Sequence, residues 1–459
     1  MQVTSTRRVA VEPGGDQVVS HVGLHALGRF ADVIGLGAAL SDAVAPRSAR
    51  LPLHDRGKVV LQAMLMLAGG GESCADIEHL RAEAALFDEV PSDSTLYRTL
   101  TKDLGSENLA ALKEAFAAVR ADVWRRAKLT KGSGPLTLDI DASLVEIHSE
   151  HKEGTGPNFK GGFGFHPMGC FVDGTGEALS MLLRPGNAGA NDAEDHLAVL
   201  DEAIAQLPEE IAAGHRDDSV AAEVRRQIVV RTDSAGATYD FVWGCFDRNV
   251  GFSVTARTTA QVQAAISYLA GDEHHDRWKR ARCQDGRHRK GAAVAEATAL
   301  VDLSEWPPRT RLIIRREPLH PGAQQSLFPS LEYRYWGHYT DQTGSPVSRD
   351  VFHRAHAHVE DHLQRLKDSG LLRFPFRDLE ANRAWLALVC MAADLVRWFQ
   401  ILCLRADLAR AEPKALRWRI FHAPARLVRS GRSSILRILD AWPDAEDLLF
   451  AYGRIALIT

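Results

Sequence analysis

The sequence predicts a mixed α/β core that has helical regions on both sides. Between residues 136 and 256, the pattern of apolar side chains indicates three strands, a helix, a strand, a helix and a strand. The preceding 130 or so residues show helical spacing, and strand-forming residues return after residue 261. A chain of 459 residues is long enough for roughly two to four domains, each with its own core.

Residues 1–130 are predicted to form a helical domain. One helical run lies around 27–39, and two more cover 56–67 and 73–86. The segment Pro91-Ser92-Asp93-Ser94 offers capping residues for another helix. Three short helices with a tight turn before the last resemble a helix-turn-helix, a DNA-binding motif. Its exposed face would carry Thr95, Arg98 and Lys102. A helical bundle without DNA contact is the alternative.

Residues 131–260 are assigned to the α/β core. The predicted elements are strands at 136–141, 164–172 and 178–183, a helix capped by Asn191, a strand at 228–233, a helix at 239–248 and a strand at 251–256. This order is the one expected of a ribonuclease-H-like fold. Between the first two strands, the glycines of residues 161–164 indicate a hairpin bend, because the features of a phosphate loop are missing there.

A long interval separates these elements from the helical stretch 352–372. It is rich in strand-forming residues, most clearly at 312–315 and 331–336. We therefore predict a mostly β insertion at 261–345. Its tryptophans are expected in the core more often than as platforms for a flipped base, and which of them stacks on DNA stays open. They are Trp278, Trp306 and Trp336.

Two segments complete the predicted organisation. Residues 346–405 would finish the α/β core, and residues 406–459 would form a basic helical region at the C-terminus. The net charge of −4 does not by itself indicate nucleic-acid binding. Basic residues are nevertheless concentrated in the C-terminal region, without an intervening acid, at Lys414, Arg417, Arg419, Arg426, Arg429, Arg432 and Arg437.

Composition excludes several classes of protein. Hydrophobic residues make up 45% and charged residues 25% of the chain, as in ordinary globular proteins. The 6 cysteines form no Cys-x-x-Cys pair, which argues against a zinc ribbon and fits a reducing cytoplasm. No secretory signal is evident. The most apolar long segment, 384–404, contains Asp394 and Arg397, so we expect a buried helix and no membrane span.

Three carboxylates stand at positions suited to metal-dependent chemistry. Asp141 and Asp233 end predicted strands, and Glu360 lies in the helical stretch 352–372. Ligand sites in open α/β sheets gather at the carboxyl ends of strands, which favours Asp141 over Asp139 on the same strand face. Oxygen ligands suit hard cations such as Mg²⁺.

Order, spacing and local context of these carboxylates resemble the catalytic triad of the DDE transposases encoded by bacterial insertion sequences. In the branch with a β insertion, the catalytic Glu sits in a Tyr-x2-Arg-x3-Glu-x6-Lys signature. Counted from Glu360, Lys367 matches the Lys position, whereas His356 replaces the Arg and His353 replaces the Tyr. The spacings place all four residues on one helical face.

The resemblance implies an enzyme that transfers phosphoryl groups on DNA with two Mg²⁺ ions, or Mn²⁺ in their place. Asp141, Asp233 and Glu360 would be both the catalytic residues and the metal ligands. Such an enzyme binds the terminal repeats of its insertion sequence, works as a homodimer and joins the cut ends to target DNA. In this branch, excision passes through a DNA hairpin. The resemblance also implies a cytoplasmic, nucleoid-associated protein.

Cationic and imidazole side chains are the expected DNA contacts. They are Lys367, His356, His353, Arg98, Lys102, Arg417, Arg419, Arg426 and Arg429. A catalytically inactive DNA-binding descendant and a ribonuclease-H-like nuclease remain alternatives. A zinc hydrolase built on His358 and His362 is disfavoured, because Glu360 lies two residues from each and adjacent to neither.

Overall fold

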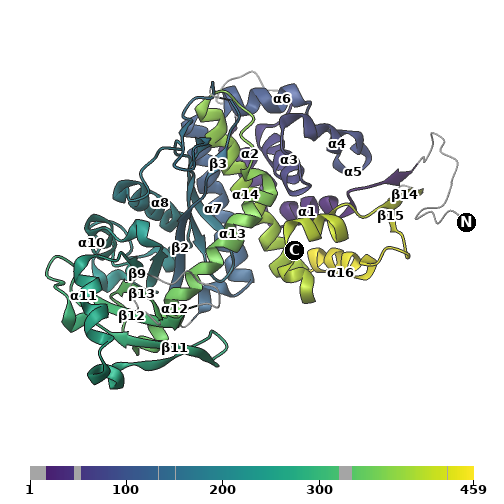
Figure 1. Ribbon diagram of the computed structural model, residues 1–459. Helices are drawn as coiled ribbons and strands as arrows, with labels where there is room; N and C mark the ends of the chain where they lie inside the picture. The colour runs from purple at the N-terminus through teal and green to yellow at the C-terminus, as the bar shows by residue number, and fades with distance from the viewer. Residues whose placement is uncertain are drawn as a thin grey trace, which may run out of the picture.

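The computed structural model describes residues 17–45, 53–132, 134–149, 151–319, 333–431 and 433–458 (Figure 1). A large mixed sheet occupies one part of the molecule, and helices from both ends of the chain gather beside it. The predicted combination of a mixed α/β core with helical regions is therefore confirmed.

A nine-stranded sheet is the framework of the molecule, in the order β10-β11-β12-β13-β9-β8-β2-β6-β7. The strands are β2 (Leu136–Ala142), β6 (Met168–Val172), β7 (Ala178–Leu182), β8 (Ile228–Thr232), β9 (Gly251–Ala256), β10 (Lys279–Arg282), β11 (His288–Glu296), β12 (Arg311–Pro318) and β13 (Tyr333–Thr340). β2, β8 and β9 run parallel, and the other neighbours pair antiparallel. The meander β2-β6-β7 followed by β8 and β9 has the predicted strand order.

The predicted strand 164–172 is divided in two. β5 (Phe163–Phe165) belongs to a small sheet with β3 (Val145–Glu146) and β4 (Gly156–Pro157), and β6 continues in the large sheet. Pro167 separates them, because it lacks the N–H that a continuous strand would need. The bend predicted from the glycines lies between β4 and β5, where Gly161 has a φ of 82°.

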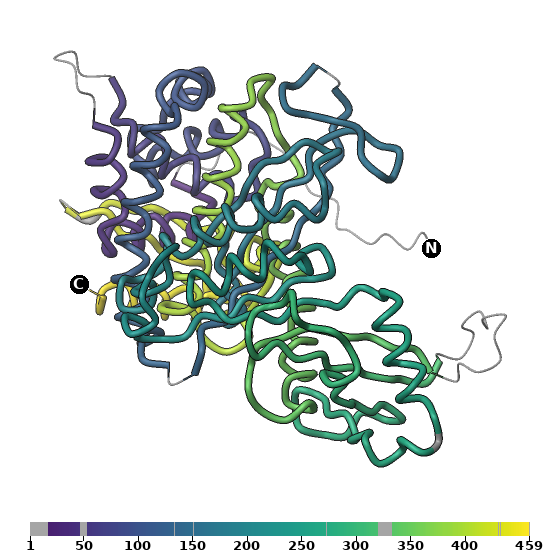
Figure 2. The backbone as a smooth tube through the Cα atoms, turned by 90° about the vertical axis from the view of Figure 1, so that its left-hand side faces the viewer, coloured from purple at the N-terminus to yellow at the C-terminus, as the bar shows by residue number. Residues whose placement is uncertain are grey.

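The insertion extends the core sheet and does not form a sheet of its own. β13 pairs with β9, and β12, β11 and β10 follow outward. A helix, α11 (Ala260–Leu269), precedes these strands. Within the predicted strand 331–336, Leu331 and Glu332 lie outside the described residues. Figure 2 shows this end of the sheet projecting from the helical part.

Helices cover both faces of the sheet. α8 (Ala193–Ala205) and α10 (Tyr239–Asp247) pack on the face to which Cys170 and Val172 point. α13 (Val359–Leu366) and α14 (Leu379–Cys403) pack on the face of Phe171. The helix α12 (Pro346–Arg354) contacts β10 and β11. The cap of α8 is Asp192, whose Oδ1 accepts from two backbone amides, and not the predicted Asn191.

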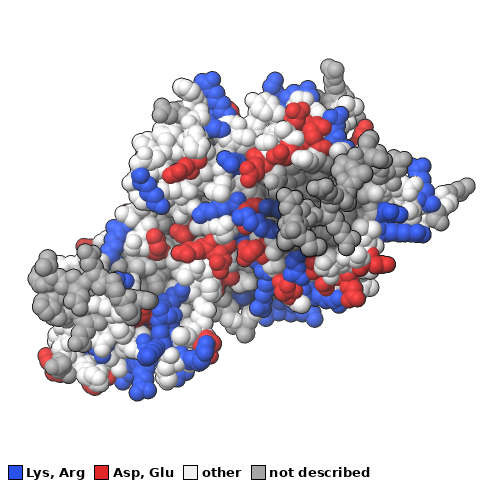
Figure 3. All heavy atoms as spheres, turned by 45° about the vertical axis from the view of Figure 1, so that its right-hand side comes forward, with Lys and Arg blue, Asp and Glu red and all other residues white. Residues whose placement is uncertain are grey.

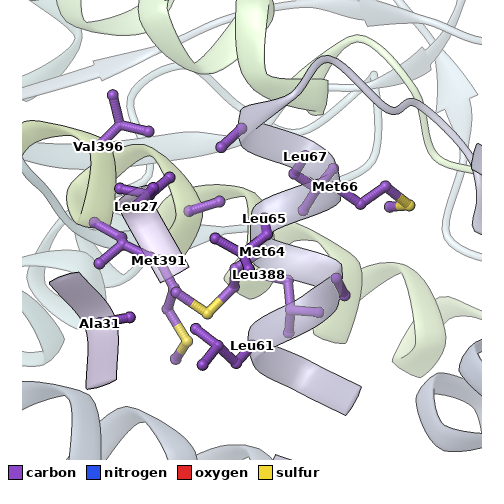
Figure 4. Packing of buried hydrophobic residues seen from close by; sticks show 14 of the residues in the cluster. Leu27, Ala31, Leu61, Met64, Leu65, Met66, Leu67, Leu388, Met391 and Val396 are labelled. Carbon is purple, nitrogen blue, oxygen red and sulfur yellow. The ribbon is translucent and has the colours of Figure 1, made fainter. Parts of the chain in front are cut away.

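The long helix α14 joins the N-terminal helices to the sheet. By length and composition it is the one helix among the described residues that could cross a membrane, yet 72% of its most apolar window is buried inside the molecule. This agrees with the expected buried helix. In Figure 4, Leu388 and Met391 of α14 lie against Leu61 and Met64 of α3 (Arg56–Ala68) and Leu27 of α1 (Val22–Val33).

The N-terminal helices follow the prediction, but the runs predicted at 27–39 and 73–86 are both broken, the second at Glu83. The run predicted at 27–39 is two helices, α1 and α2 (Leu36–Ala43), because Gly35 adopts a φ of 75° between them. The other helices are α4 (Ile77–Ala82), α5 (Ala84–Phe87), α6 (Asp93–Arg98) and α7 (Ser106–Arg126). Ser92 caps α6 by accepting from the amide of Thr95.

The C-terminal region 406–459 was predicted to be helical, and this prediction is wrong for part of it. After α15 (Pro413–Leu416), β14 (Ala425–Ser430) and β15 (Ser433–Ile438) form a hairpin, and β1 (Val18–Val19) adds a third strand. The hairpin forms because Gly431 adopts a φ of 61° between two alternating segments. Arg432 lies outside the described residues. The helix α16 (Ala445–Ala456) follows and packs on α1.

Candidate active site

Two of the three carboxylates stand at the ends of neighbouring parallel strands. Asp141 is the penultimate residue of β2, and Asp233 directly follows β8. Asp139 and Arg231 are paired across these strands, so Asp141 and Asp233 lie one step further along the same face. Each has a local anchor: Oδ1 of Asp141 accepts from the amide of Ala142 at 2.8 Å, and Oδ1 of Asp233 from that of Ala235 at 2.8 Å.

The turn after β8 is tight enough to require glycine. A Cβ at Gly236 would lie 2.2 Å from Oγ1 of Thr232, closer than any side chain tolerates. The short helix η5 (Ser234–Gly236) therefore turns the chain away at once and leaves Asp233 exposed. Arg257, at the end of β9, donates to the carbonyl oxygen of Ser234 at 3.1 Å and braces this turn.

Glu360 is presented by the helix that packs on β2. Val359, Leu363 and Leu366 form the buried side of α13, and Glu360 is exposed. A short 3-10 helix, η8 (Ala355–His358), connects α12 to α13. The amphipathic spacing of α13 thus decides that Glu360 faces away from the core.

Electrostatics links the three carboxylates. Burial raises the pKa of Asp141, and the negative charges of Asp233 and Glu360 raise it further, while the amide of Ala142 and the ring of His356 act in the opposite direction. Asp233 and Glu360 are therefore each within electrostatic reach of Asp141. Across the described segments, no three His, Cys, Asp or Glu side chains stand close enough to hold a metal ion as they are.

The donor set fits a hard divalent cation. Carboxylate oxygens are the ligands that Mg²⁺ and Mn²⁺ take, and a cation would remove the mutual repulsion that raises the pKa of Asp141. Asp141, Asp233 and Glu360 are the side chains that would hold it. Each of the three carboxylates comes from a different element. The distance from Glu360 to Asp141 and Asp233 therefore depends on how α13 packs on the sheet.

Asp139, the other aspartate on this face of β2, is fully buried. Its two oxygens accept from Nε and Nη2 of Arg231 at 2.8 and 2.6 Å. The charge of Asp139 is therefore balanced inside the fold, whereas Asp141 faces the other two carboxylates.

The two histidines at signature positions point inward. Both ring nitrogens of His353 are occupied, at 2.9 Å from Oγ of Ser253 and 3.0 Å from Oγ1 of Thr255, and the ring stacks on His338 at 4.4 Å. Burial lowers the pKa of His353 well below its usual value. The ring of His353, a predicted DNA contact, is thus held inside the fold. The ring of His356 is only 13% exposed, and its Nδ1 lies 2.8 Å from Oδ1 of Asp139.

The histidines of the zinc-hydrolase alternative have separate surroundings. Nδ1 of His358 lies 2.9 Å from Asp173, and its Nε2 lies 3.0 Å from the amide of Gln284. The ring of His362 packs near Phe171 with both nitrogens buried, and burial lowers its pKa. They do not converge on one point, so this alternative gains no support.

Five cations among the predicted DNA contacts have no charged partner within the described structure: Arg98, Lys102, Lys367, Arg426 and Arg429. Arg98 and Lys102 are exposed on α6 and the turn after it, although Arg98 also donates to Thr95 at 3.3 Å. Lys367 is half-buried at the end of α13.

Arg417 and Arg419, both predicted DNA contacts, already have partners within the protein. Arg417 donates to the carbonyl oxygens of Ala68 and Asp368, and burial lowers its pKa. Arg419 binds Asp444 at 2.6 Å and also Asp407. Arg419 nevertheless keeps 30% of its side chain exposed.

Arg426 and Arg429 are exposed on β14. The hairpin places Arg437 of β15 directly opposite Arg426, a pairing that the predicted helix could not reveal. The β10–β11 hairpin exposes five further cations that no pattern in the sequence marks: Lys279, Arg280, Arg282, Arg287 and Lys290. Figure 3 shows basic and acidic side chains interspersed over one face of the molecule.

Other unpredicted residues near the site come from the neighbouring strands. Arg231 follows an apolar strand segment, where a buried cation needs an acidic partner; that was the available signal. Nothing in the sequence marks Asp173 as its second partner. Of the three tryptophans, Trp278 and Trp306 are buried, and Trp336 is 40% exposed with Arg315 over its ring.

Comparison with known proteins gives one family. The family model described as "Transposase DDE domain group 1" matches residues 1–459. No curated protein matches. A solved structure of a piggyBac transposase synaptic complex with hairpin DNA is similar at a TM-score of 0.41 and 10% identity, over 86% of this chain and 80% of that one. A likeness this distant carries no argument about function.

Proposed function

Since the chain belongs to the transposase DDE domain group 1 family, which implies DNA transposition by phosphoryl transfer, we propose that it cuts and joins DNA at the ends of its own insertion sequence. The observation that carries this proposal is the placement of Asp141 and Asp233 at the ends of neighbouring parallel strands, where the charges of Asp233 and Glu360 both act on Asp141. The strand order β7-β6-β2-β8-β9 supports a ribonuclease-H-like core for this chemistry.

The three carboxylates have distinct roles in the proposal. Asp141 would serve both divalent cations, and Asp233 and Glu360 would each hold one of them. Mg²⁺, or Mn²⁺, supplies activation of the attacking water or 3′-hydroxyl and stabilisation of the leaving oxygen when bound. The protein's own contribution is to hold these oxygens in place and to align the DNA backbone.

Cationic side chains align the DNA. Lys367, on the helix of Glu360, is the proposed contact to the phosphate next to the reacting one. Arg98 and Lys102 would contact the terminal repeat through the helix-turn-helix-like region, and Arg426 with Arg437 would contact DNA from the β14–β15 hairpin. A homodimer holding both ends, a DNA hairpin during excision and a cytoplasmic location are parts of the same proposal.

Cleavage of the DNA that flanks the protein's own gene tests this function. We expect strand cleavage with Mg²⁺ or Mn²⁺ and end binding without cleavage in Ca²⁺, because Mg²⁺ sites demand a tighter geometry. Asp141→Ala, Asp233→Ala and Glu360→Ala should each reduce cleavage by at least about 1,000-fold, as expected when a group that acts as a unit is broken. End binding, measured by gel shift, should stay close to wild type.

Asp139→Asn is the control for the assignment on β2. It should retain residual cleavage, because Asp139 accepts hydrogen bonds from Arg231 and is not one of the three proposed metal ligands. Cleavage lost in Asp139→Asn but kept in Asp141→Ala would reverse the two roles. Wild-type protein that binds the ends and never cuts them would favour the inactive DNA-binding descendant.

A further inference from the structure

Arg231 is a buried guanidinium that connects four elements. Besides its two bonds to Asp139 of β2, its Nη2 lies 2.8 Å from Oδ1 of Asp173, in the turn after β6. Its Nη1 donates to the carbonyl oxygen of Phe352 on α12 at 2.8 Å, and the Phe352 ring lies 5.0 Å from the guanidinium carbon. One side chain thus ties β8 to β2, to the β6–β7 turn and to the helix that leads into η8.

The segment before Glu360 is attached to the same two aspartates. Nδ1 of His356 lies 2.8 Å from Asp139, and Nδ1 of His358 lies 2.9 Å from Asp173. Both histidines belong to η8, and Glu360 follows two residues later. The two anchoring points of η8 are therefore the two acids that Arg231 holds.

These contacts lie one step below the carboxylate cluster. Asp139 precedes Asp141 by two residues on β2, and Arg231 precedes Asp233 by two on β8, so each pair shares a strand face. Because η8 is attached to Asp139 and Asp173, a shift of η8 relative to these two residues also moves Glu360 relative to Asp141 and Asp233.

We propose that Arg231 is a positioning residue, which fixes Glu360 by holding the two aspartates that anchor η8. The inference deepens the proposed function and rests on the role given there to the three carboxylates. It also accounts for the two imidazoles in η8, because at positions 356 and 358 each ring reaches an acid that is already oriented by the guanidinium.

Geometry distinguishes this role from simple charge balance. A guanidinium presents its donors in a rigid planar fork, which here serves two carboxylates and a carbonyl oxygen at once. A lysine at this position keeps the positive charge but has a single rotatable ammonium group. Arg231→Lys therefore removes the fork while Asp139 and Asp173 keep a cation beside them.

Arg120 offers a matched control inside the same chain. It is 1% exposed, as Arg231 is, and it also holds two acids, with Nη2 2.6 Å from Asp394 and Nε 3.2 Å from Glu177. This triad packs between α7 and α14, and its described contacts include none of the three site carboxylates. Arg120→Lys thus reports the general cost of replacing a buried arginine.

The first measurement uses Mn²⁺ alone, titrated into the full-length protein and followed by the electron paramagnetic resonance signal of free Mn²⁺. Loss of a group that orients metal ligands typically weakens metal binding about 10- to 100-fold, so Arg231→Lys should raise the Kd for Mn²⁺ by that factor. Arg120→Lys should leave it unchanged. Equal Kd values for wild type and Arg231→Lys would overturn the inference, as would a wild type that binds no Mn²⁺.

The second measurement is single-turnover cleavage of saturating end DNA. A displaced carboxylate should slow the chemical step about 100-fold without changing the Kd for DNA. Similar losses in Arg120→Lys would show a general packing effect and refute the positioning role. If wild type binds Mn²⁺ but cuts no DNA, the proposed function fails, while the Mn²⁺ difference between the two lysine variants still decides the positioning role.

Two outer variants cover the case in which Arg231→Lys does not fold. The side chains of His358 and Asp173 are 42% and 25% exposed, so His358→Gln and Asp173→Asn disturb little of the core. Each should weaken Mn²⁺ binding in the same direction and to a smaller extent. Wild-type Mn²⁺ affinity in both would contradict the anchoring of η8.

Discussion

Lys367 and Arg419 were both expected to contact DNA, and the structure holds them very differently. Arg419 binds Asp444 at 2.6 Å and also Asp407, whereas no ion pair of Lys367 occurs within the described structure. An arginine that already has two acidic partners loses those partners if it turns to a phosphate. A half-buried lysine beside the Glu360 helix loses nothing comparable.

Salt dependence separates these two residues. Lys367→Ala should lower the affinity for end DNA and reduce the slope of log K against log salt by about 1, as expected for one lost phosphate contact. Arg419→Ala should leave that slope unchanged, although it removes two ion pairs. Filter binding between roughly 50 and 200 mM salt measures both, and equal slopes for wild type and Lys367→Ala would exclude Lys367 from the DNA interface.

At the scale of a single element, the β14–β15 hairpin places two like charges face to face. Arg426 and Arg437 are directly opposite across the strands, and both are exposed. Like charges in such a pair destabilise a hairpin. Leu427 and Leu436 pack against the core from the other side of the hairpin and hold it in place. A hairpin that exposes paired cations in this way is suited to a polyanion such as DNA.

The double variant Arg426→Gln/Arg437→Gln tests the hairpin. It should weaken end binding and reduce the salt slope by about 0.9 for each phosphate contact that is lost, while the cleavage rate of saturated complexes stays near wild type. Arg405→Gln is the matched control, because Arg405 is 48% exposed in the same region but paired with Asp447 at 2.7 Å. A double variant that binds DNA with the wild-type slope would remove the hairpin from the interface.

At the scale of the whole molecule, α14 carries a buried acid into the contact between the helical part and the sheet. Asp394 lies on α14, accepts from the amide of Ala178 on β7 at 2.8 Å and binds Arg120 at 2.6 Å. Burial raises the pKa of Asp394 from 3.8 to about 7, helped by the charge of Glu177 and opposed by that of Arg120. The folded protein thus keeps a proton on Asp394 at pH values where the unfolded chain has lost it.

The sign of the pH effect follows from this difference. A carboxyl group whose pKa is raised by folding contributes stability that is fully present below about pH 4 and is lost as pH rises to about 7. Asp394→Asn cannot ionise and should lack this component. Denaturant unfolding at several pH values should therefore show a smaller loss of stability between about pH 4 and 7 in the variant than in wild type. Parallel curves would mean that Asp394 titrates alike in both states.

Local patterns were sufficient to predict the order of the elements from β2 to β9 and to place Asp141 and Asp233 at strand ends. Apolar periodicity and capping depend on neighbours in sequence, which is why the sequence predicts β2, β8 and α6, with the cap of α6 among residues 91–94. The placement of Asp141 and Asp233 at strand ends is likewise a local property. Because strand ends are where ligand sites gather in open sheets, it led to the candidate site without any knowledge of tertiary contacts.

Burial of the cationic and imidazole side chains was decided by contacts between distant parts of the chain. His353 forms a hydrogen bond with Ser253, which is 100 residues away in the sequence. Arg417 donates to the carbonyl oxygen of Ala68, which is 349 residues away. No local pattern contains these partners, so both residues were expected at the DNA surface. The same holds for Arg231, whose acids Asp139 and Asp173 belong to other elements. Spacing places a side chain on a face of its element, and only the packed fold determines what covers that face.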